Sequence, residues 1–357
     1  MGYLCPVGVA CLEIALLVAP PGAVRLALQL FGRLVCAFAH GWDKMEVAAY
    51  AGGVVKKLIS FVVTTLLMCF TLFPPQAAAQ DAPARVTIIY DAFGKPSNLA
   101  RGWGFSALIE YGGKRILFDT GGRYRAFAEN AGKLGINLKS LDFVVISHRH
   151  GDHTSGLAYV LQQNPNVKIY APSETGSFGT PVMPPTTKLL ERRVADAPDD
   201  SHYFDGNYPD KYAVDSPWPG ANISVVDKPF EVMPGFFLFR TVSEKKGTLE
   251  LNELSMAIKT PKGLVVVVGC SHPGIEKILA AAVQIDSNLY SVVGGLHLVD
   301  VSDQEVIQIV ENFQQKWKIQ RVAAGHCSGE FAQAEFKRQF GIRHDHSGVG
   351  EIIALPR

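Results

Sequence analysis

Three histidines and an aspartate lie within six positions of the segment SHRHGDHTSG, directly after the apolar run LDFVVI. His148 and His150 are two residues apart, so in an extended segment both imidazoles can point toward one metal ion. Asp152 and His153 follow Gly151, which lets the chain turn, and they can face a second ion. Each tetrahedral ion of the zinc type still needs a further protein ligand and an open position for water. The segment therefore predicts one half of a dinuclear metal site.

The remaining ligands are expected after other buried strands, because an open sheet presents its loops at the carboxyl ends of its strands. Three of the ten histidines meet that demand: His272 after LVVVVGCS, His297 after YSVVGGL and His326 after RVAAG. The alternative for each of them is a buried histidine that is hydrogen-bonded to backbone. Asp119, in LFDTG, is suited to hold a ligating imidazole by its second ring nitrogen, with a turn cap as the alternative.

The six cysteines are unevenly placed, and only Cys270 and Cys327 come late in the chain, each within two residues of a histidine. This spacing is a poor disulfide framework and is compatible with a metal neighbourhood. Two small buried side chains are the alternative interpretation.

The composition is that of a globular protein, with 357 residues, 48% hydrophobic residues and a net charge of +1. Such a chain can bury one large core or two modest ones. The near-neutral charge and the lack of a basic run with interleaved aromatics argue against a nucleic-acid partner. We expect a small-molecule substrate, and the oligomeric state stays open.

Residues 55–79 have the order of a secretory signal peptide: Lys56 and Lys57, an apolar stretch from Leu58 to Phe73, two prolines and the small-residue sequence AAAQ. The prediction is cleavage near Ala79 and a periplasmic or secreted protein that meets the membrane only through this leader. Residues 1–54 are interpreted as an upstream extension. Alternatives are a permanent anchor at the apolar stretch and a membrane hairpin over residues 5–39.

From residue 80 onward the pattern is that of one domain. The segment SALIEYGGKRILFDTG predicts a β-hairpin around Gly112 and Gly113. Later strands alternate with helices, including helices near residues 126–134, 273–284 and 330–340. Residues 173–222 are rich in Pro, Asp, Gly and aromatics and are interpreted as a lid insertion. Hairpins first and βα units later predict an α+β fold in which two sheets are sandwiched between helices, an αββα sandwich.

The motif SHRHGDHTSG, with LFDTG before it, resembles the metallo-β-lactamase fold superfamily and its H-x-H-x-D-H signature. The segments NAGKLGI, LNELSMAI, GCSHPGI, GGLHL and GHCSGE are similar to its branch of 7,8-dihydropterin-6-methyl-4-(β-D-ribofuranosyl)aminobenzene-5′-phosphate synthases. The resemblance covers residues 85–353. It implies that His148 and His150 bind the first metal, that Asp152 and His153 bind the second, and that His326 is the last ligand of the second site.

Two departures from the superfamily pattern affect the predicted site. The usual third histidine of the first site has no match, and His272 is the natural replacement. The usual bridging aspartate is also missing, because Gly269 and Cys270 stand where it is expected. The bridge is therefore left to Cys270, to His272 or to a hydroxide alone.

The predicted cofactors are two divalent metal ions, with zinc favoured and iron or manganese compatible with the same ligands. Two ions that share a hydroxide lower its pKa and polarise a substrate oxygen, which predicts hydrolysis of an ester, lactone, amide or phosphoester. Asp152 is expected to orient the hydroxide, and His297 to donate a hydrogen bond to the developing oxyanion. The alternatives are a pterin-phosphate condensing enzyme, against which the export signal argues, and a non-catalytic metal-binding protein.

Overall fold

The computed structural model describes residues 82–174, 196, 198, 201–207, 217–246, 248 and 251–357. The chain divides into two units, Met1–Gln76 and Ala77–Arg357, and every described residue belongs to the second. The extension and signal peptide expected over residues 1–79 lie outside the described residues, and so does most of the lid expected over residues 173–222. Within the described ranges, no helix combines the length and the apolar character that crossing a membrane requires.

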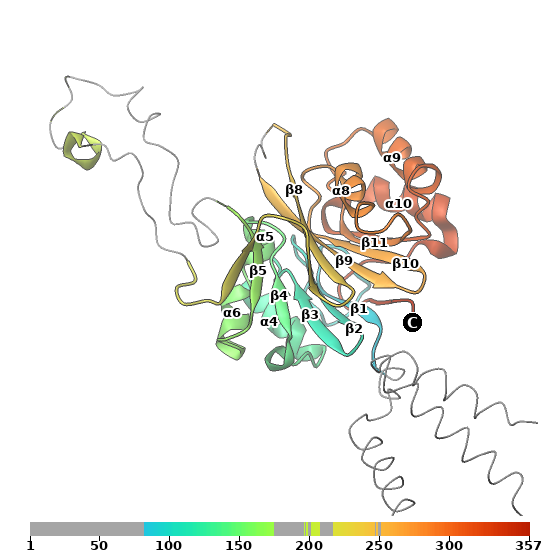
Figure 1. Cartoon of the computed structure of the whole chain (residues 1–357), viewed down its shortest axis with the longest axis horizontal. Helices are drawn as coiled ribbons and strands as arrows, with labels where there is room; N and C mark the ends of the chain where they lie inside the picture. Colours follow the sequence, from blue (N-terminus) through green and yellow to red (C-terminus); the bar gives the residue numbers. More distant parts are fainter. Residues whose placement is uncertain are drawn as a thin grey trace, which may run out of the picture. The chain divides into compact units, whose positions relative to one another are not determined.

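Two mixed β-sheets form the centre of the described part of the chain (Figure 1). The first sheet has the strand order β13-β1-β2-β3-β4-β5-β6. Its strands are β1 Arg85–Tyr90, β2 Ser106–Tyr111, β3 Lys114–Phe118, β4 Phe143–Val145, β5 Ile169–Pro172, β6 Ile223–Val226 and β13 Ile352–Ala354. The second sheet has the order β12-β11-β10-β9-β8-β7. Its strands are β7 Phe230–Met233, β8 Phe236–Val242, β9 Asn252–Thr260, β10 Gly263–Val268, β11 Leu289–Gly295 and β12 Arg321–Gly325.

The predicted hairpin is confirmed as the antiparallel pair β2 and β3. Its turn residues Gly112 and Gly113 have φ angles of 57° and 76°, a conformation that glycine adopts without steric cost. Strand β10 is buried at all six positions, which accounts for its uninterrupted apolar sequence GLVVVV.

Helices cover the outer face of each sheet (Figure 1). The helices over the first sheet are α4 Tyr124–Lys133 and α6 Leu157–Gln163, and those over the second are α8 Ile275–Ala282, α9 Asp303–Gln315 and α10 Glu330–Phe340. Short helical segments are α5 Gly151–Thr154, η2 Leu138–Ser140, η4 Tyr203–Gly206, η5 His326–Ser328 and η6 Gly341–Arg343. These layers confirm the predicted α+β fold and its αββα order.

Two details of the helices follow from their first residues. Helix α8 begins at Ile275, two residues later than predicted, because a turn closed by the Gly274 N–H and the Ser271 carbonyl comes first. Helix α9 begins at Asp303, and the hydroxyl of Ser302 accepts a hydrogen bond from the backbone N–H of Glu305 at 3.4 Å.

Three apolar clusters hold the layers together. The middle cluster contains side chains of both sheets, including Phe118 and Val145 from the first and Met256 and Val267 from the second. The outer clusters bury α4 and α6 against the first sheet and α8, α9 and α10 against the second. Each fully buried side chain of this size contributes about 1.5–3 kcal/mol. The stacked sheets are thus a rigid support for the loops at their ends.

The loops that carry the predicted ligands follow parallel strands. In the first sheet β4 is parallel to β3. In the second sheet β10, β11 and β12 are parallel to one another. Because the carboxyl ends of parallel strands lie at one edge of a sheet, the loops after β10, β11 and β12 gather there. The site is assembled from the ends of both sheets.

Candidate metal centre

The predicted ligands form two adjoining clusters in the described part of the chain. In the first cluster, one ligand atom each of His148, His150 and His272 lies within 4.8 Å of the others. In the second cluster, the same holds for Asp152, His153, Cys270 and His326.

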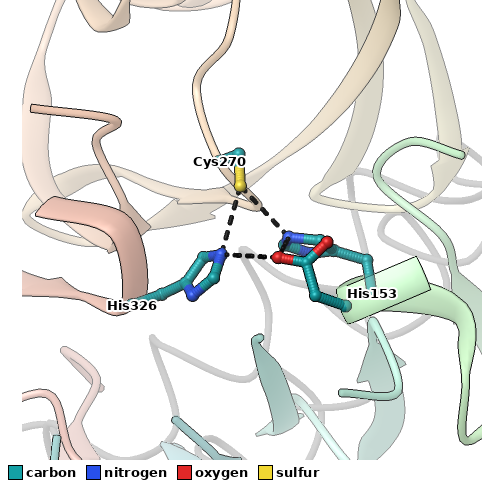
Figure 2. Close-up of side chains that lie close together, drawn as sticks. His153, Cys270 and His326 are labelled. Atoms are coloured by element: carbon teal, nitrogen blue, oxygen red, sulfur yellow. Dashed lines mark hydrogen bonds and ion pairs between the residues drawn. The ribbon is translucent and has the colours of Figure 1, made fainter. Parts of the chain in front are cut away.

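The second cluster draws its side chains from three separate elements. His153 lies in α5, Cys270 in the loop after β10, and His326 at the start of η5 after β12. Figure 2 shows these three side chains pointing toward one another. The Cys270 Sγ atom is 3.1 Å from His153 Nε2 and 3.2 Å from His326 Nε2. One carboxylate oxygen of Asp152 is 3.5 Å from the first nitrogen and 3.3 Å from the second.

These distances fit a tetrahedral ion of the zinc type. Bond lengths of about 2.0 Å to nitrogen and 2.3 Å to sulfur place neighbouring ligand atoms about 3.3–3.5 Å apart at the tetrahedral angle. The separations in the second cluster are within a few tenths of an ångström of that value. In the first cluster His148 Nε2 lies 3.1 Å from His150 Nδ1.

His272 supplies an independent argument for a metal ion. The residue is only 4% exposed, and neither of its ring nitrogens has a hydrogen-bond partner. A buried polar atom without a partner is costly and calls for an explanation. A cation bound beside His148 and His150 would satisfy one of these nitrogens. The residues present therefore fit a divalent metal at both clusters.

Asp119 makes the contact predicted for it. Its Oδ2 atom lies 2.7 Å from His153 Nδ1 and accepts a hydrogen bond from the hydroxyl of Ser147, also at 2.7 Å. The same hydroxyl lies 2.9 Å from Nδ1 of His148. One buried carboxylate thus orients an imidazole in each cluster and leaves the Nε2 atoms facing the metal positions.

Burial and neighbouring charges set the protonation of the cluster. Burial, followed by the neighbouring histidines His297 and His150, lowers the pKa of His272 to about 3. Burial also lowers the pKa of His153, but the Asp119 carboxylate outweighs it and the net value rises to about 10. Burial raises the pKa of Asp152, yet hydrogen bonds from His153 and His326 hold it well below its usual range. The first cluster is thus a set of neutral imidazoles, whereas the second carries an ionised carboxylate.

Two more buried carboxylates, neither of them predicted from the sequence, hold the ligand loops. Asp91 follows β1, and its carboxylate accepts the backbone N–H of His326 at 3.0 Å and that of Phe93 at 2.8 Å. Glu253, in β9, accepts backbone N–H groups of the loop that contains Cys270 and His272. The sequence does contain a signal for them, because each is an acidic residue in or directly after an apolar strand. A buried charge there is costly without a partner, so such a residue indicates hydrogen-bond donors nearby.

The backbone around the clusters is strained. Among the described residues, six residues other than glycine have a positive φ angle. Four of them belong to the site: Asp119, Ser271, His297 and His326. Such conformations are costly for L residues and concentrate at functional sites, where the surrounding structure enforces them.

His297 lies beside both clusters. One of its ring nitrogens is within 4.8 Å of the ligand atoms of Cys270 and His272. The residue is half-buried, and the Cys327 thiol beside it raises its pKa above the usual range. A histidine in this position can donate a hydrogen bond to a substrate oxygen or complete the coordination of a metal.

Comparisons with known proteins agree with this geometry. Residues 102–243 match the model of the metallo-beta-lactamase superfamily. The 7,8-dihydropterin-6-methyl-4-(beta-D-ribofuranosyl)-aminobenzene-5'-phosphate synthase of Methanocaldococcus jannaschii is 28% identical over 290 residues, which is 74% of this chain and 93% of that protein. A second protein of the same organism, described as uncharacterized, is 29% identical over 258 residues, 71% of this chain and 93% of its own length.

Among solved structures, Tm1679 is described as a metal-dependent hydrolase of the β-lactamase superfamily. It is 26% identical to this chain, with a TM-score of 0.57, and the match covers 77% of this chain and 100% of that one. The fold of this chain is therefore similar to that of a solved structure.

Proposed function

We propose that this chain, which carries a domain of the metallo-β-lactamase superfamily, is a hydrolase that works with two divalent metal ions. The observation that carries the proposal is the close approach of the two ligand clusters. Ligand atoms of Cys270, from the second cluster, and of His272, from the first, lie within 4.8 Å of each other and of His297. Two ions, one held by each cluster, could then act on one substrate bond.

The chain offers three histidines to the first ion and an aspartate, two histidines and a cysteine to the second. The first set is His148, His150 and His272, and the second is Asp152, His153, Cys270 and His326. When bound, two divalent ions activate water and polarise the oxygen of a substrate. Zinc suits this mixture of nitrogen, oxygen and sulfur ligands.

Two side chains have chemistry that fits hydrolysis. The Asp152 carboxylate is ionised and partly exposed, so it can accept a hydrogen bond from the attacking water and orient it. His297 has a raised pKa and can donate a hydrogen bond to the oxygen on which negative charge develops. The substrate class is a small molecule with an ester, lactone, amide or phosphoester bond.

A second candidate function is a condensation in which the amine of a ribofuranosylaminobenzene phosphate displaces a leaving group from the 6-methyl carbon of an activated dihydropterin, so that a C–N bond forms while the leaving group and the amine proton depart. It is favoured by the similarity to the Methanocaldococcus jannaschii synthase, which extends over 93% of that protein. Both functions use the same metal clusters and differ in the substrate.

One experiment separates these functions. The purified protein is analysed for metal content and assayed with a panel of esters, lactones, amides and phosphodiesters, and separately for condensation of a dihydropterin with a ribofuranosylaminobenzene phosphate. Metal-dependent hydrolysis that is lost in His148→Ala supports the hydrolase. Condensation without hydrolysis supports the synthase and refutes the hydrolase. A fully metal-loaded protein that is inactive in both assays indicates a metal-binding protein.

We also propose that the protein is exported and that the mature chain begins near Gln80. The support is the signal-peptide order of residues 55–79. The intact mass of the protein isolated from the periplasm or medium gives the position of the mature N-terminus directly. A mass that still includes residues 1–50 refutes it.

A further inference from the structure

We propose that Glu253 is a positioning residue that keeps the two metal sites in register, because it fixes the one loop that gives a ligand to each of them. The inference builds on the two-metal site of the proposed function. The loop in question is Gly269–His272, which follows β10 and places Cys270 in the second cluster and His272 in the first.

A single buried carboxylate binds three consecutive N–H groups of this loop. Glu253 is fully buried in β9. One of its oxygens accepts hydrogen bonds from the backbone N–H groups of Cys270 at 2.9 Å and Ser271 at 2.7 Å. The other oxygen accepts from the N–H of His272 at 2.8 Å. Hydrogen bonds to a carboxylate are stronger than neutral ones, and three of them define the position of the loop closely.

The loop needs such a partner because of its conformation. In an extended chain, residues 270 and 272 would point to the same side. Ser271 has a φ angle of 64°, in the left-handed region. This turn directs three successive N–H groups inward and lets the side chains of Cys270 and His272 reach different clusters. Without the carboxylate, three buried N–H groups would lose their partner.

The strand that carries Glu253 also holds the other ligand loop. The backbone N–H of Leu254 donates a hydrogen bond to the carbonyl of Ser147 at 2.8 Å, and Ser147 directly precedes the ligand His148. The loops also pack closely, since a Cβ atom at Gly269 would lie 2.2 Å from the hydroxyl oxygen of Ser147. Two neighbouring residues of β9 therefore set the position of one ligand loop relative to the other.

The test is a cobalt(II) titration of the metal-free protein with Glu253→Gln. The glutamine amide keeps one acceptor oxygen, and its NH₂ group would face the N–H of His272 or, in the other orientation, those of Cys270 and Ser271. We expect the affinity for both ions to fall about 10–100-fold. We also expect the thiolate-to-cobalt charge-transfer absorption that arises from Cys270 to weaken or disappear.

Glu110→Gln is the matched control. Glu110 is also a buried carboxylate, 5% exposed, but it pairs with Arg85 and Arg115 on the first sheet rather than with a ligand loop. We expect this variant to lose thermal stability while it keeps the wild-type cobalt absorption and affinity. A Glu253→Gln variant that behaves in the same way would reduce Glu253 to a structural role and overturn the proposal.

If circular dichroism shows that Glu253→Gln does not fold, Glu253→Asp is the variant to measure, because it keeps the carboxylate on a side chain that is one methylene shorter. Wild-type cobalt affinity and absorption in Glu253→Asp would overturn the proposal. If the wild-type protein binds only one cobalt ion, the two-metal function fails. In that case wild-type affinity and absorption for the single ion in Glu253→Gln refute the role of Glu253, whereas loss of both at that ion retains a positioning role there.

Discussion

Replacing His272 by alanine is expected to affect the metal-loaded and the metal-free protein differently. Zinc sites with four ligands bind with about 10–16 kcal/mol, so one ligand is worth roughly 3–4 kcal/mol. Because about 1.4 kcal/mol corresponds to a factor of ten, the affinity of the first cluster should fall by about two to three powers of ten. In excess metal, the same free energy is lost from the stability of the folded protein, because only the folded state holds the site.

The same substitution should change the free energy of unfolding of the metal-free protein very little. Loss of the packed ring of His272 costs about 2 kcal/mol of buried surface. The substitution also removes two buried ring nitrogens that lack a hydrogen-bond partner, a burden of about 1–3 kcal/mol. These effects oppose each other, so the free energy of unfolding should change by less than about 1 kcal/mol.

The assay is denaturant unfolding of both proteins in chelator and in excess zinc, combined with a competition titration for affinity. His344→Ala is the control, because His344 is a half-buried histidine that contacts Gln333 rather than either cluster. It should leave both metal affinities unchanged. The reasoning is refuted if His272→Ala keeps wild-type affinity at the first cluster. It is also refuted if the metal-free variant is destabilised by several kcal/mol, since the ring would then have had a partner in the folded protein.

Three further predictions concern other parts of the site. Cys270→Ser should abolish the thiolate-to-cobalt absorption and lower the affinity for the ion at the second cluster, while the first cluster keeps its ion. A spectroscopic titration measures both, and an unchanged spectrum contradicts the assignment of the thiolate to Cys270. Trp103 is 54% exposed and its ring lies beside the second cluster, so Trp103→Ala should raise KM with little change in kcat or metal content, as steady-state kinetics will show. Burial raises the pKa of Glu253 to about 7 and that of Asp91 to about 8, and Asp119 brings that of His153 to about 10 despite burial. All three groups bind their proton more tightly when folded, so their contribution to the stability of the metal-free protein is complete below about pH 4 and is lost as the pH rises from about 4 to about 10. Thermal melts measure this, and a contribution that grows over that range would contradict the prediction.

Much of the fold, and the clustering of the candidate ligands, could be predicted because titratable residues directly follow several apolar strands of the chain. The run GLVVVV and the glycines at residues 112 and 113 are local signals, and they predict a buried strand and a hairpin without any knowledge of the rest of the fold. Histidines directly after such strands were brought together because the strands are parallel and end at one edge.

The assignment of Cys270 could not be predicted, and the reason is local. The sequence left the position between the metals to Cys270, to His272 or to a hydroxide. The structure brings the cysteine into the second cluster and the histidine into the first. That division depends on the left-handed backbone at Ser271, for which a serine gives no signal, and on the carboxylate of Glu253 from another strand.

The two ligand clusters also connect the two halves of the sandwich, in addition to the apolar middle cluster and the hydrogen bonds between their loops. Cys270 follows β10 of the second sheet, whereas His153 lies in α5, which follows β4 of the first sheet. The two side chains approach within 3.1 Å although they are 117 residues apart in the chain. An ion bound to both closes that length of chain as a cross-link would, and a loop of about 100 residues closed in this way corresponds to roughly 4–5 kcal/mol of lost chain entropy in the unfolded state. Separation of the sheets would then release the ion, so the concentration of metal around the protein would govern how long it stays folded.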